Sequence, residues 1–497
     1  MRRSPSTQPS KETHAPRKAL NYARQVRLRL WHSPHGCHEL PEQFPQGAQE
    51  WPELHGNADG SQRPARYLGH MEILRDPLWN NIRLDPLALA LLDTPVLQRL
   101  RYVRQLGLAF LVYPGATHSR FEHALGAYHL AGVALRLLDE RGALAGVSAH
   151  DQQVVRAAAL LHDVGHYPFS HALEEIGVTH HEEVARPLIM QGPVAEALVK
   201  ALGAEAPAQV FALITGRSES ALQGLISGSL DLDKVEYLKR DAAMCGVPYG
   251  EIDVDRLLNS LVLVAHPTHG QPTVGVHEKG LSALESLLFA KYQMYRNVYW
   301  HHAVRSATAM YKRLVAVALE AQAVTADSVA RFTDEGLLLH LEAATLPRDA
   351  TAMLAGLRGR RLHKRTYECP AATLGDEVGE WIASDYALTR RVEDALAAEL
   401  GMARGDLLLD FPAKTQMLGL ELPMLRRNGS VEQLTAAGWE GDINLPRLSD
   451  ELYRSARRLR VFTAARAPIP ESRVLAVLRL DAADVSERLR ASIPLLG

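Results

Sequence analysis

The pattern of hydrophobic positions predicts a mainly α fold with short strands near both ends. Apolar and polar residues alternate from residue 71 to residue 86, where Pro77 and Pro86 break the alternation, so a short hairpin is expected there. Apolar residues then recur mostly at helical spacing as far as about residue 310. Beyond it, helical patterns precede the strand-like runs LLLDFP and LRVFTA and an Asn428-Gly429 turn, which favours a smaller C-terminal α+β lobe.

The helices of the central stretch can be bounded from their capping residues. One is expected to begin at Pro95 and to end at Gly107, a suitable C-cap, before the strand-like run FLVYPG. Further helices are expected over residues 117–142 and 152–161, from Glu174 onward, and over 227–241 and 281–311.

Composition excludes several classes of protein. The 497 residues are 47% hydrophobic and 23% charged with a formal net charge of -2, so the chain as a whole is not suited to a polyanion and any phosphate binding must be local. No apolar run is long enough to span a bilayer. The three cysteines, Cys37, Cys245 and Cys369, are too few and too scattered for a disulfide framework, so a cytoplasmic protein is expected.

Three regions are expected along the chain. Residues 1–65 form a poorly ordered basic and Pro-rich tail, residues 66–310 a helical domain that holds the candidate motifs described below, and residues 311–497 the α+β lobe. The tail interleaves Pro and Ser with its basic residues and has few aromatic residues, which favours a solvated leader. Contact of this tail with single-stranded nucleic acid is the alternative.

The stretch LLHDVGHYPFSH carries the strongest chemical signal. His162 and Asp163 end an apolar run, and His166 and His171 stand on either side of Pro168. Buried imidazole and carboxylate groups need compensation, which a divalent cation commonly provides. A lone His-Asp pair is more often a helix cap, but further acid or imidazole clusters follow around His123, His181 and Asp233.

Two other helical segments combine charged and aromatic residues. In the first, Asp233, Lys234, Tyr237 and Asp241 share one helical face, although an exposed ion-pair ladder would explain the charged members. The second carries several tyrosines, cations and histidines, a composition suited to stacking on a nucleotide and pairing with phosphate. Its candidates are Lys291, Tyr295, Arg296, Tyr299, His301 and His302.

Together these motifs resemble a known family. SRFEHALG, LLHDVGHYPFSH, the His181-Glu182 pair and DLDKVEYLKRD, in this order, are similar to the HD-domain phosphohydrolases, and specifically to deoxynucleoside triphosphate triphosphohydrolases of the SAM-and-HD-domain type. DTPVLQRLRYVRQLG, YPGATH and VYWHH extend the likeness, which covers residues 71–311 strongly and RRLRVFTA faintly. The resemblance implies an HD-domain helical core; no SAM domain is evident in the short N-terminal segment.

The resemblance also implies a metal centre and a catalytic group. It assigns one divalent ion, Mn, Fe, Mg or Zn, to His123, His162, Asp163 and Asp233. Around the α-phosphate it places His166, His171, His181 and Glu182. His171 would protonate the leaving sugar oxygen, while His166 with His181 or Glu182 would orient or deprotonate the attacking water.

Substrate and regulatory positions follow from the same likeness. Phosphate contacts would come from Arg120, Lys234, Tyr237 and Lys291, with Lys291 standing where relatives have arginine. Gln105 and Asp241 would hold the 3′-hydroxyl, Tyr299 would stand against C2′, and Tyr295 belongs to the same aromatic group. Asp93, Gln98 and Arg101 match positions that bind an activating guanine nucleotide, but Glu72, Arg75 and His302 depart from that pattern, and Glu174 replaces an aspartate.

The expected activity is metal-dependent hydrolysis of a Mg-bound deoxynucleoside triphosphate, dGTP first among them, to deoxynucleoside and inorganic triphosphate. The resemblance implies a homo-oligomer, a tetramer or a hexamer. Two alternatives stay open: an HD phosphohydrolase acting on another nucleotide or phosphate ester, and a non-catalytic regulator that binds nucleotides.

Overall fold

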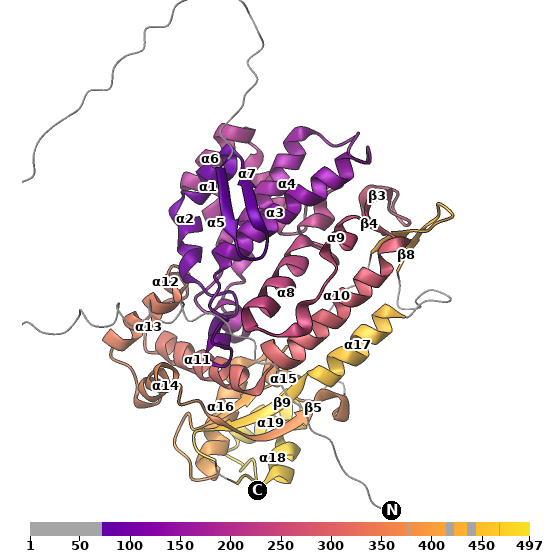
Figure 1. Cartoon of the computed structure of the whole chain (residues 1–497). Coiled ribbons are helices and arrows are strands. Elements are labelled where there is room, and N and C mark those ends of the chain that lie inside the picture. Colours follow the sequence, from indigo (N-terminus) through magenta and orange to yellow (C-terminus); the bar gives the residue numbers. More distant parts are fainter. Residues whose placement is uncertain (1–71, 376–377, 414–421, 435–443, 467) are drawn as a thin grey trace, which may run out of the picture. The chain divides into compact units, whose positions relative to one another are not determined.

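The computed structural model describes residues 72–375, 378–413, 422–434, 444–466 and 468–497, and the tail predicted over 1–65 lies outside them. Residues from Tyr67 to Gly497 form one compact unit by their internal contacts. Helices predominate, as the hydrophobic pattern predicts (Figure 1).

The predicted hairpin is present at the start of this unit. Strand β1 (Glu72–Asp76) pairs antiparallel with β2 (Asn80–Leu84), and Ile82 and Leu84 face the core. Asp85 then caps α1 (Pro86–Leu92) by accepting a hydrogen bond from the Ala88 amide, with a proline at the first helical position.

Three helices form the centre of the helical region. They are α3 (Arg120–Asp139), α4 (Ala149–Leu161) and α8 (Leu232–Cys245), and α3 packs against both of the others. Ser119 and Glu122 form a capping box that starts α3. A side chain at Gly126 would place its Cβ only 1.9 Å from Glu236 Oε1, so this glycine permits the close approach of α3 and α8.

The remaining helices surround these three or follow them. Before residue 300 they are α2 (Pro95–Arg99), α5 (His181–Met190), α6 (Gly192–Leu202), α7 (Ala206–Ile214), α9 (Val254–Leu258) and α10 (Leu281–Met294). After it they are α11 (His302–Glu320), α12 (Ala326–Val329), α13 (Asp334–Ala343), α14 (Arg348–Arg358), α15 (Glu380–Ser384), α16 (Tyr386–Glu399), α17 (Leu445–Ala456), α18 (Glu471–Leu478) and α19 (Ala482–Arg490).

Several predicted boundaries were wrong, each for a local reason. The helix from Pro95 ends as a 3₁₀ turn over Leu100–Tyr102. The run FLVYPG, residues 110–115, is not a strand: its first two residues end a 3₁₀ helix over Gly107–Leu111, and the other four form turns and a bend. Gly107 has a φ of +52°, and a Cβ there would lie 2.6 Å from the carbonyl oxygen of Phe169, so this segment folds tightly onto the loop after α4. Residues 170–176 form a 3₁₀ helix, and a π turn over Tyr295–Tyr299 separates α10 from α11.

The predicted α+β lobe is not separate from the helical region. Strands β3 (Leu261–Ala265) and β4 (Pro272–His277) form a hairpin, and β7 (Pro423–Leu425) extends it in parallel beside β4, followed by β8 (Val431–Gln433). Helix α17 lies along α10 (Figure 1). The boundary predicted at residues 310 and 311 falls inside α11.

A second sheet holds the other C-terminal strands. Its order is β5 (Lys364–Pro370), β9 (Arg458–Thr463) and β6 (Leu407–Asp410), all antiparallel. The four residues of β6 are buried, and α11 and α16 both contact this strand. This sheet therefore lies against the helix that follows the π turn.

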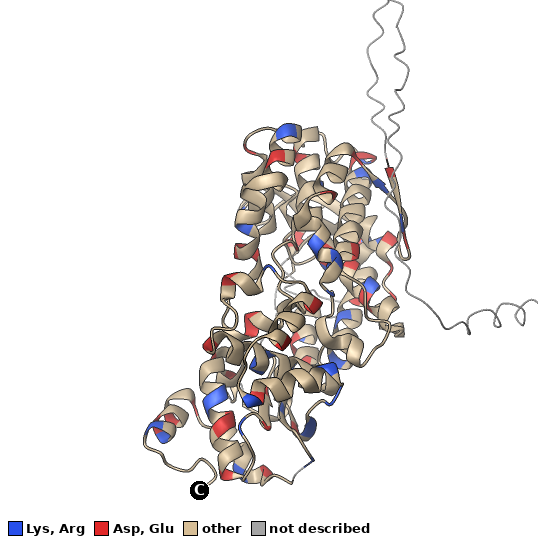
Figure 2. Ribbon diagram, turned by 90° about the vertical axis from the view of Figure 1, so that its left-hand side faces the viewer, with Lys and Arg blue, Asp and Glu red and all other residues tan. Residues whose placement is uncertain are grey.

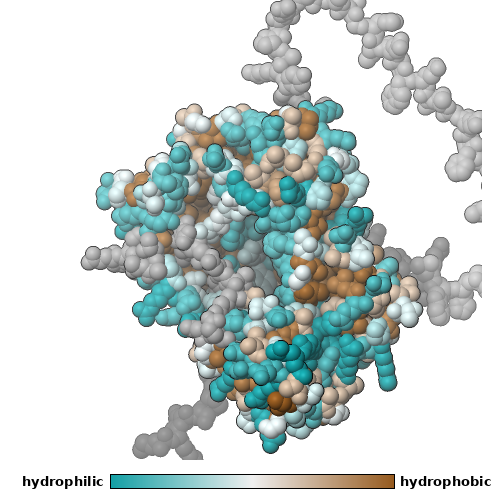
Figure 3. Space-filling model, turned by 180° about the vertical axis from the view of Figure 1, so that it is seen from behind, coloured by the Kyte–Doolittle hydropathy of each residue, from teal (hydrophilic) through white to brown (hydrophobic). Residues whose placement is uncertain are grey.

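Charge and hydrophobicity are mixed over the described surface. Basic and acidic residues are interspersed along the ribbon in the view of Figure 2, and in the view of Figure 3 a hydrophobic patch lies among hydrophilic residues. Among the described helices, none is by itself long and apolar enough to cross a bilayer; α6 and α7 reach that length only as a pair bent by 111°.

Candidate metal centre and histidine cluster

Three side chains from three helices converge at the centre of the helical region. His123 lies near the start of α3, His162 directly follows α4, and Asp233 lies in the first turn of α8. The two histidine Nε2 atoms are 3.1 Å apart, and Asp233 Oδ1 lies 2.8 Å from His123 Nε2 and 3.4 Å from His162 Nε2. Donor atoms held about 2.1 Å from one ion lie about 3.0 to 3.4 Å from each other, so the set fits a shared cation.

Asp163 completes the predicted group of four. Its Oδ1 lies 3.4 Å from His162 Nε2, and its Oδ2 lies 3.7 Å from His123 Nε2. Arg120 Nη1 donates to the same Oδ2 at 2.5 Å, and both side chains are buried. Burial opposes the charge on Asp163, but Arg120 and the two imidazoles outweigh it and hold the pKa of this carboxyl well below its usual range.

Hydrogen bonds to the far ring nitrogens aim both imidazoles at this centre. His162 Nδ1 donates to the carbonyl oxygen of Ala159 at 2.9 Å, and His123 Nδ1 lies 2.6 Å from Glu236 Oε2. Each contact leaves Nε2 facing Asp233. This is the arrangement in which an acceptor behind a histidine fixes the tautomer that binds metal.

Glu236 is a site residue that the sequence reasoning missed. It is fully buried and also accepts hydrogen bonds from Trp79 Nε1 at 2.8 Å and from Arg240 Nε at 2.7 Å. Arg240 in turn pairs with Asp76 of the hairpin at 3.1 Å. Glu236 lies three residues after Asp233 on the same face of α8, and this spacing could have identified it from the sequence.

His123 is held between two carboxylates. Burial disfavours its charged form, yet the hydrogen bonds with Asp233 and Glu236 raise its pKa to about 10. Without a cation the ring therefore carries a proton on each nitrogen. A cation at Nε2 would displace one of them, so metal binding and protonation compete at this ring.

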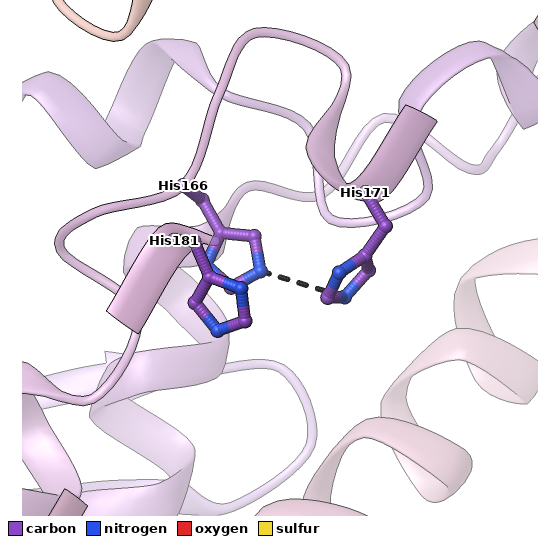
Figure 4. A group of neighbouring side chains, drawn as sticks. All are labelled: His166, His171 and His181. Carbon is purple, nitrogen blue, oxygen red and sulfur yellow. Dashed lines mark hydrogen bonds between the residues drawn. The ribbon is translucent and has the colours of Figure 1, made fainter. Parts of the chain in front are cut away.

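A second cluster lies beside this centre and contains three histidines. His166 Nε2 and His171 Nε2 are 3.4 Å apart, and the ring of His181 is tilted over that of His166 with their centroids 3.8 Å apart (Figure 4). His166 Nδ1 lies 3.2 Å from Asp163 Oδ1, which joins the cluster to the metal centre. Burial, Arg120 and the neighbouring imidazoles lower the pKa of His166 well below its ordinary value, so its ring is neutral.

Glu174 is the carboxylate that organises this cluster. Its Oε2 lies 3.1 Å from His171 Nδ1, and its Oε1 lies 2.5 Å from His181 Nδ1. The prediction placed Glu182 here, but that side chain is partly exposed and lies 4.0 Å from His180 Nδ1. His181 is the first residue of α5 and contacts Glu174 of the preceding 3₁₀ helix, whereas Glu182 is the next residue of α5 and points in a different direction.

The loop between His166 and His171 is tightly constrained. Phe169 and Ser170 both have left-handed backbone angles, with φ of 57° and 65°, which cost energy in residues with side chains. The Phe169 amide donates to Asp334 Oδ1 at 2.7 Å, and the Ser170 hydroxyl donates to the Arg104 carbonyl at the same distance. Gly165 lets α5 approach, since a Cβ there would meet the His181 carbonyl oxygen at 2.0 Å.

Asp241 lies between a buried histidine and a half-buried tyrosine. The Tyr299 hydroxyl donates to Asp241 Oδ2 at 2.8 Å, and His118 Nε2 lies 2.7 Å from Oδ1. His118 Nδ1 and Gln105 Oε1 are buried without a hydrogen-bond partner in the described chain. Such atoms suit a polar ligand. His118 was missed as an individual candidate, although it lies in the YPGATH segment.

Two lysines and two tyrosines border the same region. Tyr237 stands between His123 and Tyr299, with ring centroids 6.5 Å and 6.4 Å away. Lys234 Nζ contacts Asp231 Oδ2 at 2.5 Å. Lys291 is buried and lies over the ring of Tyr295. Burial and the charge of Lys234 lower the pKa of Lys291 to about 7.

The three predicted regulatory residues lie near α1 and α2 and make local contacts. Asp93 is the C-cap of α1. Gln98 Nε2 donates to the Leu92 carbonyl at 2.8 Å and its Oε1 accepts from Arg101 Nε at 2.8 Å. The guanidinium of Arg101 stacks 3.6 Å from the ring centroid of Phe121. These contacts support the fold whether or not a nucleotide binds.

Comparison with protein families and curated proteins identifies two matched regions. Residues 120–214 match the model of the HD domain, and residues 252–438 match that of the HD associated region. The chain is 35% identical over 272 residues to an uncharacterized protein of Methanocaldococcus jannaschii, covering 54% of this chain and 55% of that protein. The chain is also 33% identical over 257 residues to the uncharacterized protein YwfO of Bacillus subtilis, which covers 51% of this chain and 57% of that protein. The chain thus spans just over half the length of these relatives.

A shorter match with higher identity is to human deoxynucleoside triphosphate triphosphohydrolase SAMHD1, 45% identical over 104 residues, which is 21% of this chain and 17% of that protein. Among solved structures, a phosphohydrolase from Bacteroides thetaiotaomicron has a TM-score of 0.62 at 22% identity, covering 79% of this chain and 100% of that one, which shows a shared fold. The chain therefore carries an HD domain over residues 120–214 and an HD associated region over residues 252–438.

Proposed function

We propose that this protein hydrolyses deoxynucleoside triphosphates, dGTP first among them, to deoxynucleoside and inorganic triphosphate with one divalent cation. The observation that carries the proposal is the junction of the two clusters: Asp163 contacts both imidazoles of the metal centre and lies 3.2 Å from His166 of the histidine cluster. A phosphoryl group between them would meet a cation on one side and proton-transferring imidazoles on the other.

The donor set of His123, His162, Asp163 and Asp233 suits a hard or borderline divalent ion. When bound there, such an ion would polarise a phosphate oxygen and lower the pKa of water. Arg120, buried beside Asp163, holds that carboxylate in its ionised form.

The histidine cluster supplies a proton donor. His166 Nδ1 faces acceptors of Asp163, and His171 Nδ1 faces Glu174, so both rings direct Nε2 at each other across 3.4 Å. In the proposed reaction His171 donates a proton to the departing 5′-oxygen while water attacks the α-phosphorus and the bond from that phosphorus to the 5′-oxygen breaks.

The sugar and the polyphosphate have separate candidate partners. Asp241 and the unpartnered Gln105 Oε1 would receive the 3′-hydroxyl, and Tyr299, fixed by its hydrogen bond to Asp241, would stand where a 2′-hydroxyl projects. Lys234, Tyr237, Lys291 and Tyr295 would border the phosphates and base. The 45% identity to SAMHD1 over 104 residues supports this substrate class.

Product analysis tests the proposal. The purified chain is incubated with each deoxynucleoside triphosphate and Mn²⁺ or Mg²⁺, with and without GTP, and products are separated by ion-exchange chromatography. Deoxynucleoside plus triphosphate is expected, and Asp233→Ala should form neither. Monophosphate plus pyrophosphate, or no turnover of any of the four substrates, would refute it.

We also propose that the protein is a homo-oligomer, a tetramer or a hexamer. Light scattering on the same samples tests this.

A further inference from the structure

A chain of ion pairs, formed by buried arginines and an aspartate with half-buried glutamates, connects the histidine cluster to the sheet of β5, β9 and β6. It begins at Glu175, the residue after the carboxylate that orients His171 and His181. Arg305 of α11 forms a bidentate ion pair with Glu175, in which each terminal nitrogen donates to one carboxylate oxygen at 2.9 Å. Lys312, two turns further along α11, contacts Glu175 Oε2 at 2.8 Å.

The same arginine is also fixed from the opposite side. Arg305 Nε lies 3.1 Å from both oxygens of Asp410, and Nη2 lies 2.5 Å from Oδ1. Asp410 belongs to β6 and is 0% exposed. Arg460 of β9 lies 3.9 Å from Asp410 and donates to Glu368 of β5 at 2.8 Å. The network therefore reaches every strand of this sheet.

Such a network is sensitive to the loss of any member. Buried charges are stable only when they are paired, and a planar guanidinium offers each of two carboxylates a pair of parallel N–H donors, a geometry that an ammonium lacks. Burial opposes the charge of Glu175, but Arg305 and Lys312 hold its pKa well below the usual range. Glu174 and Glu175 share the 3₁₀ helix over Ser170–Ile176, so fixing one carboxylate fixes the backbone that carries the other.

We propose that Arg305 is a positioning residue for the histidine cluster: anchored by Asp410, it holds Glu175 and thereby keeps Glu174 in place against His171 and His181. The inference rests on the proposed function for its effect on turnover. It adds that the sheet after residue 360 sets the geometry of imidazoles that lie about 130 positions earlier than Arg305 in the chain.

Arg313 provides a matched control on the same helix. It is also fully buried, and it pairs with Glu393 at 3.3 Å and with Asp394 at 2.5 Å, both on α16. Arg313→Lys therefore also removes a buried guanidinium that pairs with two carboxylates. Within the described chain, Glu393 and Asp394 form no hydrogen bond or ion pair with the histidine cluster.

Turnover is the first measurement. In Arg305→Lys and Asp410→Asn, kcat for the best deoxynucleotide should fall about tenfold to a hundredfold, because small misplacements of catalytic groups have effects of that size. KM and bound metal should stay within about twofold of wild type. Arg313→Lys should keep kcat within about twofold at a similar loss of thermal stability. A kcat of Arg305→Lys no lower than that of Arg313→Lys would overturn the inference.

Histidine NMR is the second measurement and does not depend on activity. In ¹⁵N-histidine protein, the ring signals of His171 and His181 are assigned by His171→Gln and His181→Gln. Wild type should show Nδ1 protonated in both rings, and Arg305→Lys should alter these signals while Arg313→Lys leaves them in place. Unaltered signals in Arg305→Lys would overturn the inference. If wild type turns over no deoxynucleotide, the spectra alone decide; if Arg305→Lys does not fold, Asp410→Asn carries both measurements.

Discussion

Glu236 Oε2 lies 2.6 Å from Nδ1 of His123, while Asp233 Oδ1 lies 2.8 Å from Nε2 on the other side of the same ring. One turn of α8 thus supplies both the candidate metal ligand and the carboxylate that stands behind the histidine ligand. Because Glu236 is completely buried and also receives hydrogen bonds from Trp79 and Arg240, its position is fixed before any cation arrives.

Replacing Glu236 should therefore weaken metal binding without unfolding the protein. Glu236→Gln keeps an oxygen for Trp79 or Arg240 but loses the negative charge behind His123, and changes of this kind typically lower metal affinity about 10-fold to 100-fold. Calorimetric titration of the metal-free protein with Mn²⁺ measures the effect. Glu393→Gln, a buried carboxylate beside Arg313, is the control and should bind Mn²⁺ as wild type does. Equal affinities in the two variants would show that Glu236 has no such role.

The two aspartates of the centre should differ in their effect on stability. Asp163 is buried against Arg120, so Asp163→Ala leaves a buried guanidinium unpaired and should lower the unfolding free energy by about 3 to 5 kcal/mol. The side chain of Asp233 is 34% exposed, so the loss of unfolding free energy in Asp233→Ala should be about 1 to 2 kcal/mol smaller than the loss in Asp163→Ala. Both variants should lose metal. Urea unfolding of metal-free samples gives the comparison, and a larger loss for Asp233→Ala would contradict it.

Glu174 and Glu182 give opposite predictions from adjacent helices. Glu174→Gln removes the charge that orients His171 and His181, and kcat should fall about 100-fold with little change in KM. Glu182→Gln alters a partly exposed side chain and should leave kcat within about threefold of wild type. Steady-state kinetics on both variants test the assignment. It is wrong if Glu182→Gln is the more damaging substitution.

Lys291 should give the reaction a pH dependence. Burial and Lys234 lower the pKa of Lys291 to about 7, so the ammonium is present below pH 7 and is lost as the pH rises through it. If it contacts the polyphosphate, kcat/KM should fall between pH 6.5 and pH 8.5 relative to Lys291→Arg, since arginine stays charged up to about pH 12. The ratio of wild type to variant at each pH removes the contribution of other groups. A flat ratio would exclude Lys291 from phosphate binding.

The sequence predicts most of what local rules control. Helical periodicity places α3, α4 and α8, and the predicted ligands His123, His162, Asp163 and Asp233 do meet. Their grouping into one ligand set was predicted from the resemblance of the motifs to the HD-domain phosphohydrolases, because spacing along the chain indicates only separate clusters.

Contacts made through loops and between distant segments were not predictable in the same way. Glu174, and not the predicted Glu182, contacts His181, because the chain turns back between the 3₁₀ helix and α5. No periodicity of the sequence encodes that contact. The run FLVYPG, residues 110–115, was predicted as a strand, but its first two residues end the 3₁₀ helix over Gly107–Leu111, which closes against Phe169. Likewise, nothing local to residues 423–433 indicates that they pair with β4, about 150 residues earlier.

The parallel pairing of β7 with β4 has a consequence for synthesis on the ribosome. Residues 261–277 leave the exit tunnel long before residues 423–433 exist, so the edge of β4 stays uncovered while some 150 further residues are translated. Exposed strand edges invite association with other chains. A nascent chain stalled after residue 310 would hold the metal ligands without the strand that closes this edge, and we expect it to be captured by chaperones rather than released as a folded fragment.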